Sequence, residues 1–301
     1  MRPRTGLAAL LVLVLALSGT ALLLPGTSAL AAPILAARDL LADRLWDDGK
    51  AELSVYRGTI ERYGKPRPLA VRIIVVKEAM DEEQRVKAER FPRAGRTRDV
   101  LKVHALYDFP TGTYDYHQAT SAFLDRASAD LAKLAMASTE GCGITYVEVL
   151  PEAAGWRHVS HSYWDGEGDH AMVLATHRER TTLAADGLAL WLRRLDLKRA
   201  QRFEVNLLPS QRSGRVQNQE LPTATIEVTG RADRHGLPVV VRWTGGDARA
   251  RTDRYWFDPA WPHALARFEG GADPTTFARV KTMRLAYWEK NAPGDERLLA
   301  P

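Results

Sequence analysis

Two stretches of the sequence decide the fold: LAVRIIVVK at residues 69–77 and VLKVHALYDF at residues 100–109. The first is dominated by β-branched residues, and in the second Leu101 and Val103 alternate with the polar Lys102. β-Branched runs and a two-residue alternation of apolar and polar side chains are typical of β-strands. Both stretches therefore predict strands.

Similar runs follow one another from residue 53 to residue 288, which predicts about a dozen strands. Only residues 182–195 have a clear helical pattern, with Thr182 placed to cap the helix. The apolar residues of that segment fall on one helical face: Leu188, Trp191, Leu192 and Leu195. Strands joined by short turns pair antiparallel. The sequence therefore predicts a mainly β (α+β) fold, built as curved, meandering antiparallel sheets or an open barrel with one amphipathic helix.

Residues 1–31 have the three parts of an export signal. Arg2 and Arg4 precede an almost wholly apolar run over residues 7–24, and Ala-Leu-Ala at residues 29–31 offers small side chains for cleavage. The alternative is an uncleaved membrane anchor, because the apolar run is long enough to span a bilayer. The helix-breaking Pro-Gly pair between the run and the cleavage site favours removal.

The sequence therefore predicts a mature chain that begins at Ala32 and is exported to the periplasm or the cell exterior. Residues 32–301 are expected to form a single β-rich domain with a sub-sheet boundary near residues 170–200. No later segment is apolar enough to form a transmembrane helix.

Charge and cysteine content narrow the classes of partner. Residues 1–31 carry two arginines and no acid, so their removal lowers the formal charge from +5 to +3. This mixed charge gives no reason to expect nucleic-acid binding, which needs basic residues clustered on one face. Cys142 is the sole cysteine of the sequence, so an internal disulfide is excluded.

Reactive residue types are densest between Glu140 and His170. Cys142 lies between two glycines, and His161 lies on the second predicted strand after it. A thiol becomes a nucleophile when a neighbouring imidazole takes its proton. A Cys142–His161 pair in a hydrolase or transferase is therefore the alternative function, although no third, orienting residue is evident. The other interpretation is a half-buried cysteine in a glycine turn.

The same region gives no metal site and no cofactor motif. His158 and His161 are three residues apart, which on a strand places them on opposite faces. The acidic run that begins at Asp165 resembles the start of a calcium loop, but its sixth position is His170 and its twelfth is Thr176. A calcium loop of this kind needs Gly and Glu there. A solvated acidic turn is the favoured interpretation.

Aromatic residues near the ends of the late strands suggest a binding groove. A curved sheet can line such a groove with the candidate residues Tyr163, Trp243, Trp256 and Trp288. Ordinary core packing is the alternative. We expect a non-enzymatic cell-envelope protein that binds a lipid, another apolar or amphipathic ligand, or an envelope protein partner.

Seven segments spread over most of the chain after residue 45 carry a family resemblance: WDDGKAE (46–52), RYG (62–64), VK (86–87), DFPTGTY (108–114), EGCG (140–143), SHSYWDGE (160–167) and YW (287–288). In these segments the sequence resembles an uncharacterised family of exported and lipoprotein-type bacterial proteins that often carry the label septum formation inhibitor Maf. Here Gly141 stands where that family usually has tryptophan. The resemblance implies no established activity. A looser similarity is to curved-sheet envelope proteins that carry lipids or lipoproteins.

True Maf proteins are cytoplasmic nucleotide pyrophosphatases of the α/β class. This chain differs from them in its predicted export signal, its β-dominated pattern and its lack of a glycine-rich phosphate loop before a helix.

Overall fold

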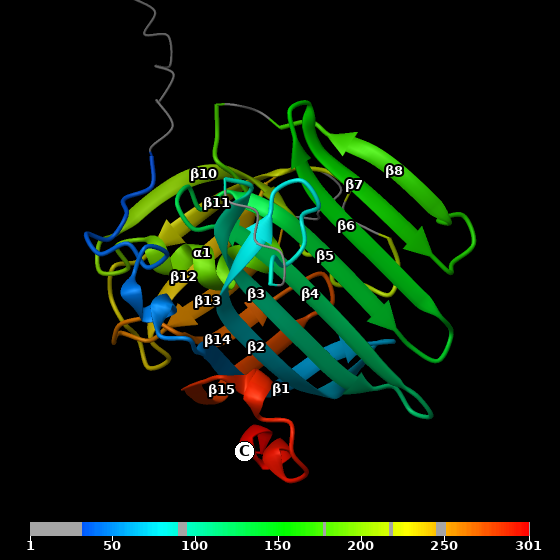
Figure 1. Cartoon of the computed structure of the whole chain (residues 1–301). Helices are drawn as coiled ribbons and strands as arrows, with labels where there is room; N and C mark the ends of the chain where they lie inside the picture. Colours follow the sequence, from blue (N-terminus) through cyan, green and yellow to red (C-terminus); the bar gives the residue numbers. More distant parts are fainter. Residues whose placement is uncertain (1–31, 90–94, 177–178, 217–218, 245–250, 301) are drawn as a thin grey trace, which may run out of the picture.

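A computed structural model describes residues 32–89, 95–176, 179–216, 219–244 and 251–300. The predicted export signal, residues 1–31, lies outside the described residues. The described chain forms one sheet of fifteen strands with a short helix on its concave side (Figure 1). The prediction of a mainly β, curved and meandering fold is confirmed.

The strands appear in three groups along the chain. The first eight are β1 (Ala51–Arg62), β2 (Lys65–Asp81), β3 (Thr97–Pro110), β4 (Asp115–Asp125), β5 (Leu131–Thr139), β6 (Ile144–Glu152), β7 (Gly155–Ser162) and β8 (Asp169–Leu174). A short β9 (Thr182–Ala184) leads into a helical segment made of η2 (Ala185–Gly187), α1 (Leu188–Trp191) and η3 (Leu192–Arg194). The rest are β10 (Gln201–Leu208), β11 (Thr223–Val228), β12 (Leu237–Trp243), β13 (Thr252–Phe257), β14 (Leu265–Gly270) and β15 (Thr275–Leu285). Three 3₁₀ turns lie outside these groups: η1 (Arg44–Asp47), η4 (Tyr287–Glu289) and η5 (Asp295–Leu299).

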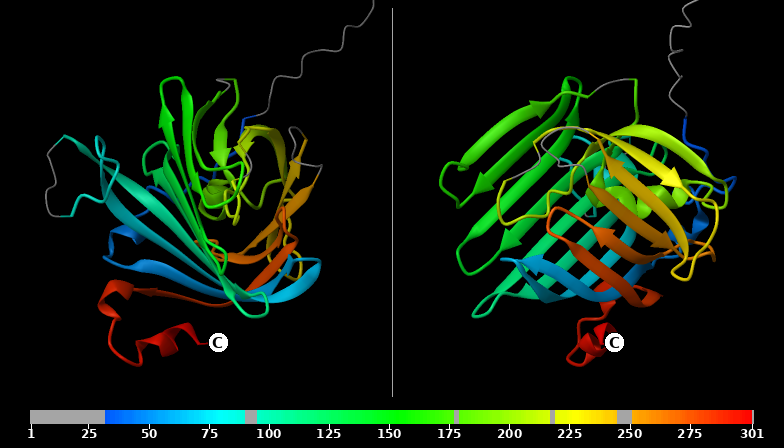
Figure 2. Two further views of the ribbon diagram at one scale, coloured as in Figure 1. Left: turned by 90° about the vertical axis from the view of Figure 1, so that its right-hand side faces the viewer. Right: turned by 180° about the vertical axis from the view of Figure 1, so that it is seen from behind.

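The strand order runs from β8 down to β1, continues through β15, and then runs down to β9. Neighbouring strands pair antiparallel, except that β9 pairs parallel to β10. The sheet coils round on itself (Figure 2), but within the described residues β8 and β9 are its two unpaired edges. The sequence predicts a sub-sheet boundary near residues 170–200. In the structure these residues contain the two edge strands of a single sheet, β8 and β9, and the helical segment.

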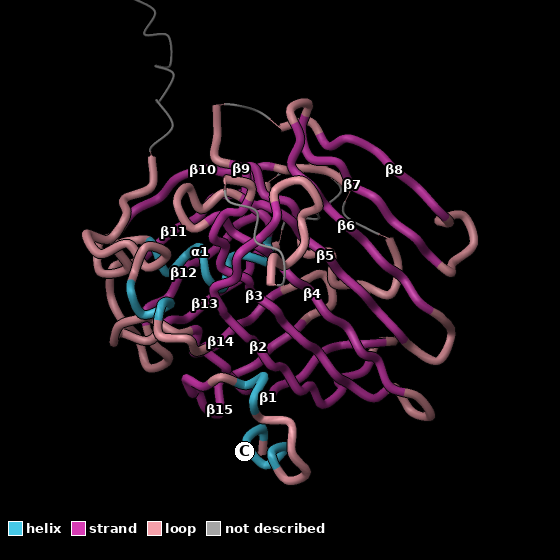
Figure 3. The backbone as a smooth tube through the Cα atoms, viewed as in Figure 1, coloured by secondary structure: helices cyan, strands magenta, loops and turns pink. Residues whose placement is uncertain are grey.

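The core fills the concave side of the sheet. On β5 the buried residues alternate with partly exposed ones, as expected for a strand with one face on the core. The helical segment packs into this concavity and buries Leu188, Leu190 and Leu192 completely. Figure 3 shows it surrounded by strands, so the helix covers part of the concave face from inside. The residues of the predicted apolar face are buried, and so are Leu190, Arg193 and Arg194 on the other sides of the helix.

The helix is shorter than predicted, because it begins at Ala185 rather than at Thr182. Thr182 is the first residue of β9, where it pairs with Asn206 of β10. The backbone of Thr182 to Ala184 therefore satisfies the edge of β10, and Thr182 does not act as a helix cap. A threonine side chain can cap a helix, but here the backbone of Thr182 pairs with β10 at the sheet edge.

Strand β8 also departs from the sequence interpretation, which placed a solvated acidic turn at residues 165–170. The chain turns at residues 165–168 and then pairs with β7 from Asp169 onward. Most of β8 is exposed on both faces. It therefore lacks the alternation of apolar and polar residues from which strands are recognised.

The convex face carries a smaller apolar cluster under the C-terminal segment. Ala51, Leu53, Ile74 and Val76 are buried there. Partly buried side chains from the end of β15, from η4 and from η5 pack on them: Met283, Leu285, Tyr287 and Leu299.

Candidate functional site

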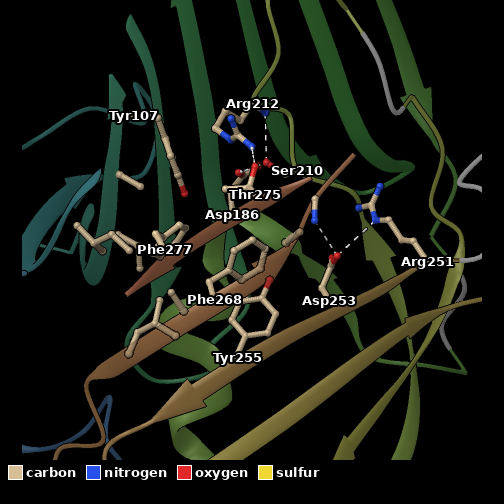
Figure 4. A pocket seen from close by; sticks show the side chains of 17 residues that line it. Tyr107, Asp186, Ser210, Arg212, Arg251, Asp253, Tyr255, Phe268, Thr275 and Phe277 are labelled. Atoms are coloured by element: carbon tan, nitrogen blue, oxygen red, sulfur yellow. Dashed lines mark hydrogen bonds and ion pairs between the residues drawn. The ribbon is translucent and has the colours of Figure 1, made fainter. Parts of the chain in front are cut away.

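A cavity of about 70 Å³ lies on the concave side, between the helical segment and the sheet (Figure 4). Its walls come from β2, β3, β13, β14, β15, the start of the helical segment and the loop after β10. A concave apolar pocket with a few convergent polar groups is the usual form of a small-molecule site. The lining residues are Ile73, Val103, Ala105, Tyr107, Ala185, Asp186, Ala189, Ser210, Arg212, Arg251, Asp253, Tyr255, Leu265, Phe268, Gly271, Thr275 and Phe277.

One wall of the cavity is apolar because cross-strand aromatic pairs line up on β13, β14 and β15. Phe268 lies opposite Phe277 and opposite Tyr255 in the two adjoining ladders. The Phe268 and Phe277 rings stack with centroids 5.2 Å apart, and Tyr255 meets Phe268 edge-on at 5.0 Å. Small aliphatic residues of β3, Val103 and Ala105, leave the open volume beside these rings.

The opposite wall is polar and contains the half-buried Asp186 of η2. Ser210 Oγ donates to Asp186 Oδ1 at 2.7 Å, and the Gln211 N–H donates to Oδ2 at 2.9 Å. Burial raises the pKa of the Asp186 carboxyl, and these two donors together with the nearby Arg212 oppose that rise. Asp186 thus joins the start of the helical segment to the loop after β10.

Arg212 extends from that loop over the cavity. Its Nη1 donates to Gln118 Oε1 at 3.2 Å, and its Nη2 donates to Thr275 Oγ1 at 3.3 Å. The guanidinium also lies over the ring of Tyr107, with its central carbon 4.7 Å from the ring centroid. Stacking of this kind holds the plane of an arginine while leaving N–H groups at its edge available.

A second pair of charges borders the cavity: Asp253 of β13 and Arg251, which directly precedes that strand. Asp253 Oδ2 accepts from the Trp243 indole N–H at 2.8 Å, and Oδ1 accepts from the Gly271 N–H at 2.9 Å. Arg251 Nε lies 3.6 Å from Asp253 Oδ1, and its guanidinium stacks over Trp243 at 4.3 Å. Each carboxylate oxygen of Asp253 therefore already accepts a hydrogen bond.

Two phenol groups of the cavity have no such partners. Among the described residues, neither the Tyr107 nor the Tyr255 hydroxyl makes a hydrogen bond, although both residues line the cavity (Figure 4). Burial raises the pKa of Tyr107 to about 12 and raises that of Tyr255 well above its ordinary value. Both hydroxyls are therefore protonated donors at neutral pH.

The loop over residues 209–216, which we call the strap, crosses the concave side of the sheet. Gln211 accepts a hydrogen bond from His158 Nε2 on β7 at 3.0 Å, since the Gln211 amide nitrogen donates to Pro209. The Gly214 carbonyl accepts from Thr145 and from the Trp164 indole, each at 2.7 Å. The strap thus connects the β4–β7 side of the sheet to the cavity wall, to which it contributes Ser210 and Arg212.

Glu167 anchors the far end of the strap. One of its oxygens accepts from the Val216 N–H at 2.9 Å, and the other lies 3.2 Å from Arg215 Nη1. The acidic turn of residues 165–168 therefore has a structural role, because its central carboxylate is largely buried against the strap.

The structure does not bring Cys142 and His161 together. Cys142 is exposed in the turn between β5 and β6. His161 lies opposite Tyr146 of β6. Tyr146 comes four residues after Cys142, and four residues of extended chain span about 13 Å. The His161 ring Nδ1 instead pairs with Asp169 Oδ1 of β8 at 2.9 Å, and both side chains are exposed.

The four aromatic residues expected to line a groove are distributed over different parts of the molecule. Trp243 is buried behind the cavity, where it bonds Asp253. Trp256 donates to Asp233 at 2.8 Å and lies outside the cavity lining. Trp288 belongs to η4 beneath the convex face, and Tyr163 is an exposed residue against Gly143.

The polar residues of the cavity had no sequence signal. Asp186, Arg212, Tyr107 and Tyr255 are far apart along the chain, and none belongs to a spaced motif. Alternation on β3 and β13 could have placed Tyr107 and Tyr255 on the inward face. Nothing in the loop sequence around Arg212 indicates that it crosses the interior.

Among the described residues, no group of three His, Cys, Asp or Glu side chains is arranged to hold a metal ion. None of the helices found there combines the length and apolarity that a bilayer crossing needs.

No protein-family model matches the sequence, and no curated protein is significantly similar to it. Among solved structures, the chain is similar to the beta-barrel-like protein of domain of unknown function DUF1849 from Brucella abortus. The two share 8% sequence identity with a TM-score of 0.48, over 78% of this chain and 98% of that one.

Proposed function

We propose that this protein binds a small amphipathic molecule in the concave cavity. The observation that carries the proposal is the division of the cavity into an aromatic and aliphatic wall and a polar wall with Arg212 and two unpartnered phenol hydroxyls. Burial of an apolar ligand surface is favourable by about 25 cal/mol per Å². Unpaired buried donors gain from a ligand acceptor.

The size of the cavity limits the ligand. Its 70 Å³ is smaller than the ~150 Å³ engineered cavity that accepts benzene. A short alkyl chain, or the end of a longer one, is therefore the apolar part that this site accommodates. The Cys142–His161 alternative has no comparable support, because the register separates the two side chains.

The proposal is tested by titrating the protein with propanamide, butanamide and hexanamide, and with the matching carboxylates. Binding is followed by the thermal midpoint and by the intrinsic tryptophan fluorescence, to which Trp243 contributes through its indole bonded to the cavity residue Asp253. Ala105→Leu places a larger side chain in the cavity and should abolish binding. Ala171→Leu on the exposed face of β8 is the matched control and should bind as the unaltered protein does.

Failure of every probe to shift either signal would contradict the proposal. Binding that survives Ala105→Leu would place the ligand elsewhere on the protein.

We also propose that the chain is exported and that its mature form begins at Ala32, as its N-terminal sequence indicates. N-terminal sequencing of the protein from its host should give Ala32 as the first residue. An intact Met1 in a membrane fraction would contradict this proposal.

A further inference from the structure

The charged side chains around the cavity differ in the hydrogen bonds and ion pairs that they make with their neighbours. Asp186 and Asp253 each accept at least two hydrogen bonds from neighbouring donors. Arg251 lies against Asp253 within ion-pair distance. A carboxylate with its acceptor sites already occupied has little to offer a ligand cation, so these two acids do not form a cation site.

Arg212 differs from the other three charges. Within the described ranges, no carboxylate oxygen lies within 4.0 Å of its guanidinium, and its two side-chain hydrogen bonds go to the neutral oxygens of Gln118 and Thr275. A guanidinium has five N–H groups in a planar fork that matches a carboxylate. Arg212 is thus a half-buried cation with donors to spare beside an apolar wall.

The surroundings hold Arg212 in one orientation. Its guanidinium stacks on Tyr107, and the strap that carries it is bonded to Asp186, His158 and Thr145. The hydroxyls of Tyr107 and Tyr255 are further protonated donors on the same cavity, without partners among the described residues. Every uncommitted polar group of the cavity is therefore a donor, and this set complements an acceptor that carries negative charge.

We infer that the polar end of the ligand is a carboxylate that pairs with Arg212, while its alkyl chain lies against Phe268 and Phe277. This inference rests on the proposed function and adds the charge of the ligand to it. Of the two guanidinium groups that line the cavity, Arg251 lies 3.6 Å from a carboxylate oxygen, and Arg212 has no carboxylate within 4.0 Å among the described residues. One cation without a carboxylate partner suits a monoanion, and the small volume suits a planar carboxylate more than a phosphate group.

The test compares butanoate with butanamide, which have the same chain and differ in charge. The unaltered protein should bind butanoate roughly tenfold to a hundredfold more tightly, as expected for a charge-assisted hydrogen bond in place of a neutral one. Arg212→Gln should bind both compounds equally, and at the affinity that the unaltered protein has for butanamide. Arg242→Gln, on the exposed face of β12, is the matched control and should keep the preference for butanoate.

The outcomes separate this inference from the proposed function. Equal binding of butanoate and butanamide by the unaltered protein would overturn the inference and leave the proposed function intact, whereas no binding of either would overturn both. A preference for methyl phosphate over butanoate would overturn the carboxylate assignment, and a preference for butanoate that persists in Arg212→Gln would overturn the role of Arg212. The comparison in the unaltered protein remains decisive even where Arg212→Gln folds poorly.

Discussion

At the scale of single residues, the most deeply buried ion pair among the described residues joins the helical segment to β1. Arg193 makes two parallel bonds of 2.9 Å to Glu52, and both side chains are almost completely buried. The Arg193 guanidinium also donates from Nε to the Pro262 carbonyl at 2.9 Å. Breaking such a pair leaves a buried charge without its partner, which costs about 3–5 kcal/mol.

Glu52→Gln should therefore lower the free energy of unfolding, measured by urea denaturation, by about that amount. The exposed pair Arg242–Glu227 provides the control, since both side chains are more than a third exposed. Glu227→Gln should cost less than about 1 kcal/mol. Equal effects of the two substitutions would show that burial does not determine the strength of the Arg193–Glu52 pair.

His158 makes the stability of the fold depend on pH. Burial lowers its pKa below the ordinary value of 6.5, and the nearby His170 lowers it further, while the bond to Gln211 opposes the shift. Its Nδ1 is buried and has no hydrogen-bond partner among the described residues, so a proton there would find no acceptor. The unfolded chain therefore binds this proton more readily than the folded one does.

The stability that neutral His158 contributes is present above pH 6.5 and is lost as the pH falls from 6.5 toward the pKa of the folded state. His158→Gln should reduce the fall of the thermal midpoint across this range. His104, whose pKa burial also lowers, should retain part of the dependence. The partly exposed His235, changed to Gln, should leave the profile unaltered; a similar effect from His235→Gln would refute the assignment to His158.

At the scale of elements, the strap over residues 209–216 depends on a few hydrogen bonds to β6 and β7. Thr145 is buried and donates to the Gly214 carbonyl, which the Trp164 indole also contacts. Thr145→Val keeps the shape of the side chain and removes the donor. Loss of such a bond costs about 0.5–1.5 kcal/mol.

Amide hydrogen exchange in the strap should accelerate in Thr145→Val more than exchange in the core strands, because the strap would open locally. Thr282→Val is the control, since it removes a threonine hydroxyl that bonds Ser54 between β15 and β1, two strands that do not adjoin β6. It should leave strap exchange unchanged. Uniform acceleration throughout the sheet in Thr145→Val would instead indicate that the strap and the core open as one unit.

At the scale of the whole molecule, the sheet ends in two free edges. Edge strands offer unpaired backbone groups to other chains, and natural proteins commonly protect them with lysine or proline. β8 contains neither of these residues, and its Val173 is 50% exposed. We therefore expect β8 to be the site at which the protein begins to aggregate.

Val173→Lys should reduce light scattering during mild heating and leave the unfolding midpoint close to that of the unaltered protein. Val280→Lys is the matched control, because Val280 is similarly exposed, at 42%, but lies on the interior strand β15. An equal reduction in scattering by both variants would attribute the effect to net charge and not to the edge.

The sequence determined the class of the fold and the apolar residues that form its core. Alternation along β3 and the β-branched run of β2 predict strands, because side chains on a pleated strand face opposite sides in turn. The apolar face of residues 188–195 likewise predicts the helix that fills the concavity. These features depend on residues that are close together in the chain, so the local sequence is sufficient to predict them.

Only the tertiary structure decided where the cavity lies and which residues meet there. Arg212 and Tyr107 are separated by about a third of the chain, and they meet because the strap crosses the interior and β3 faces it. The same long-range pairing separates Cys142 from His161 and sends Trp243, Trp256 and Trp288 to different surroundings. Strand register and the path of a loop depend on contacts between distant segments, and no pattern within one segment specifies them.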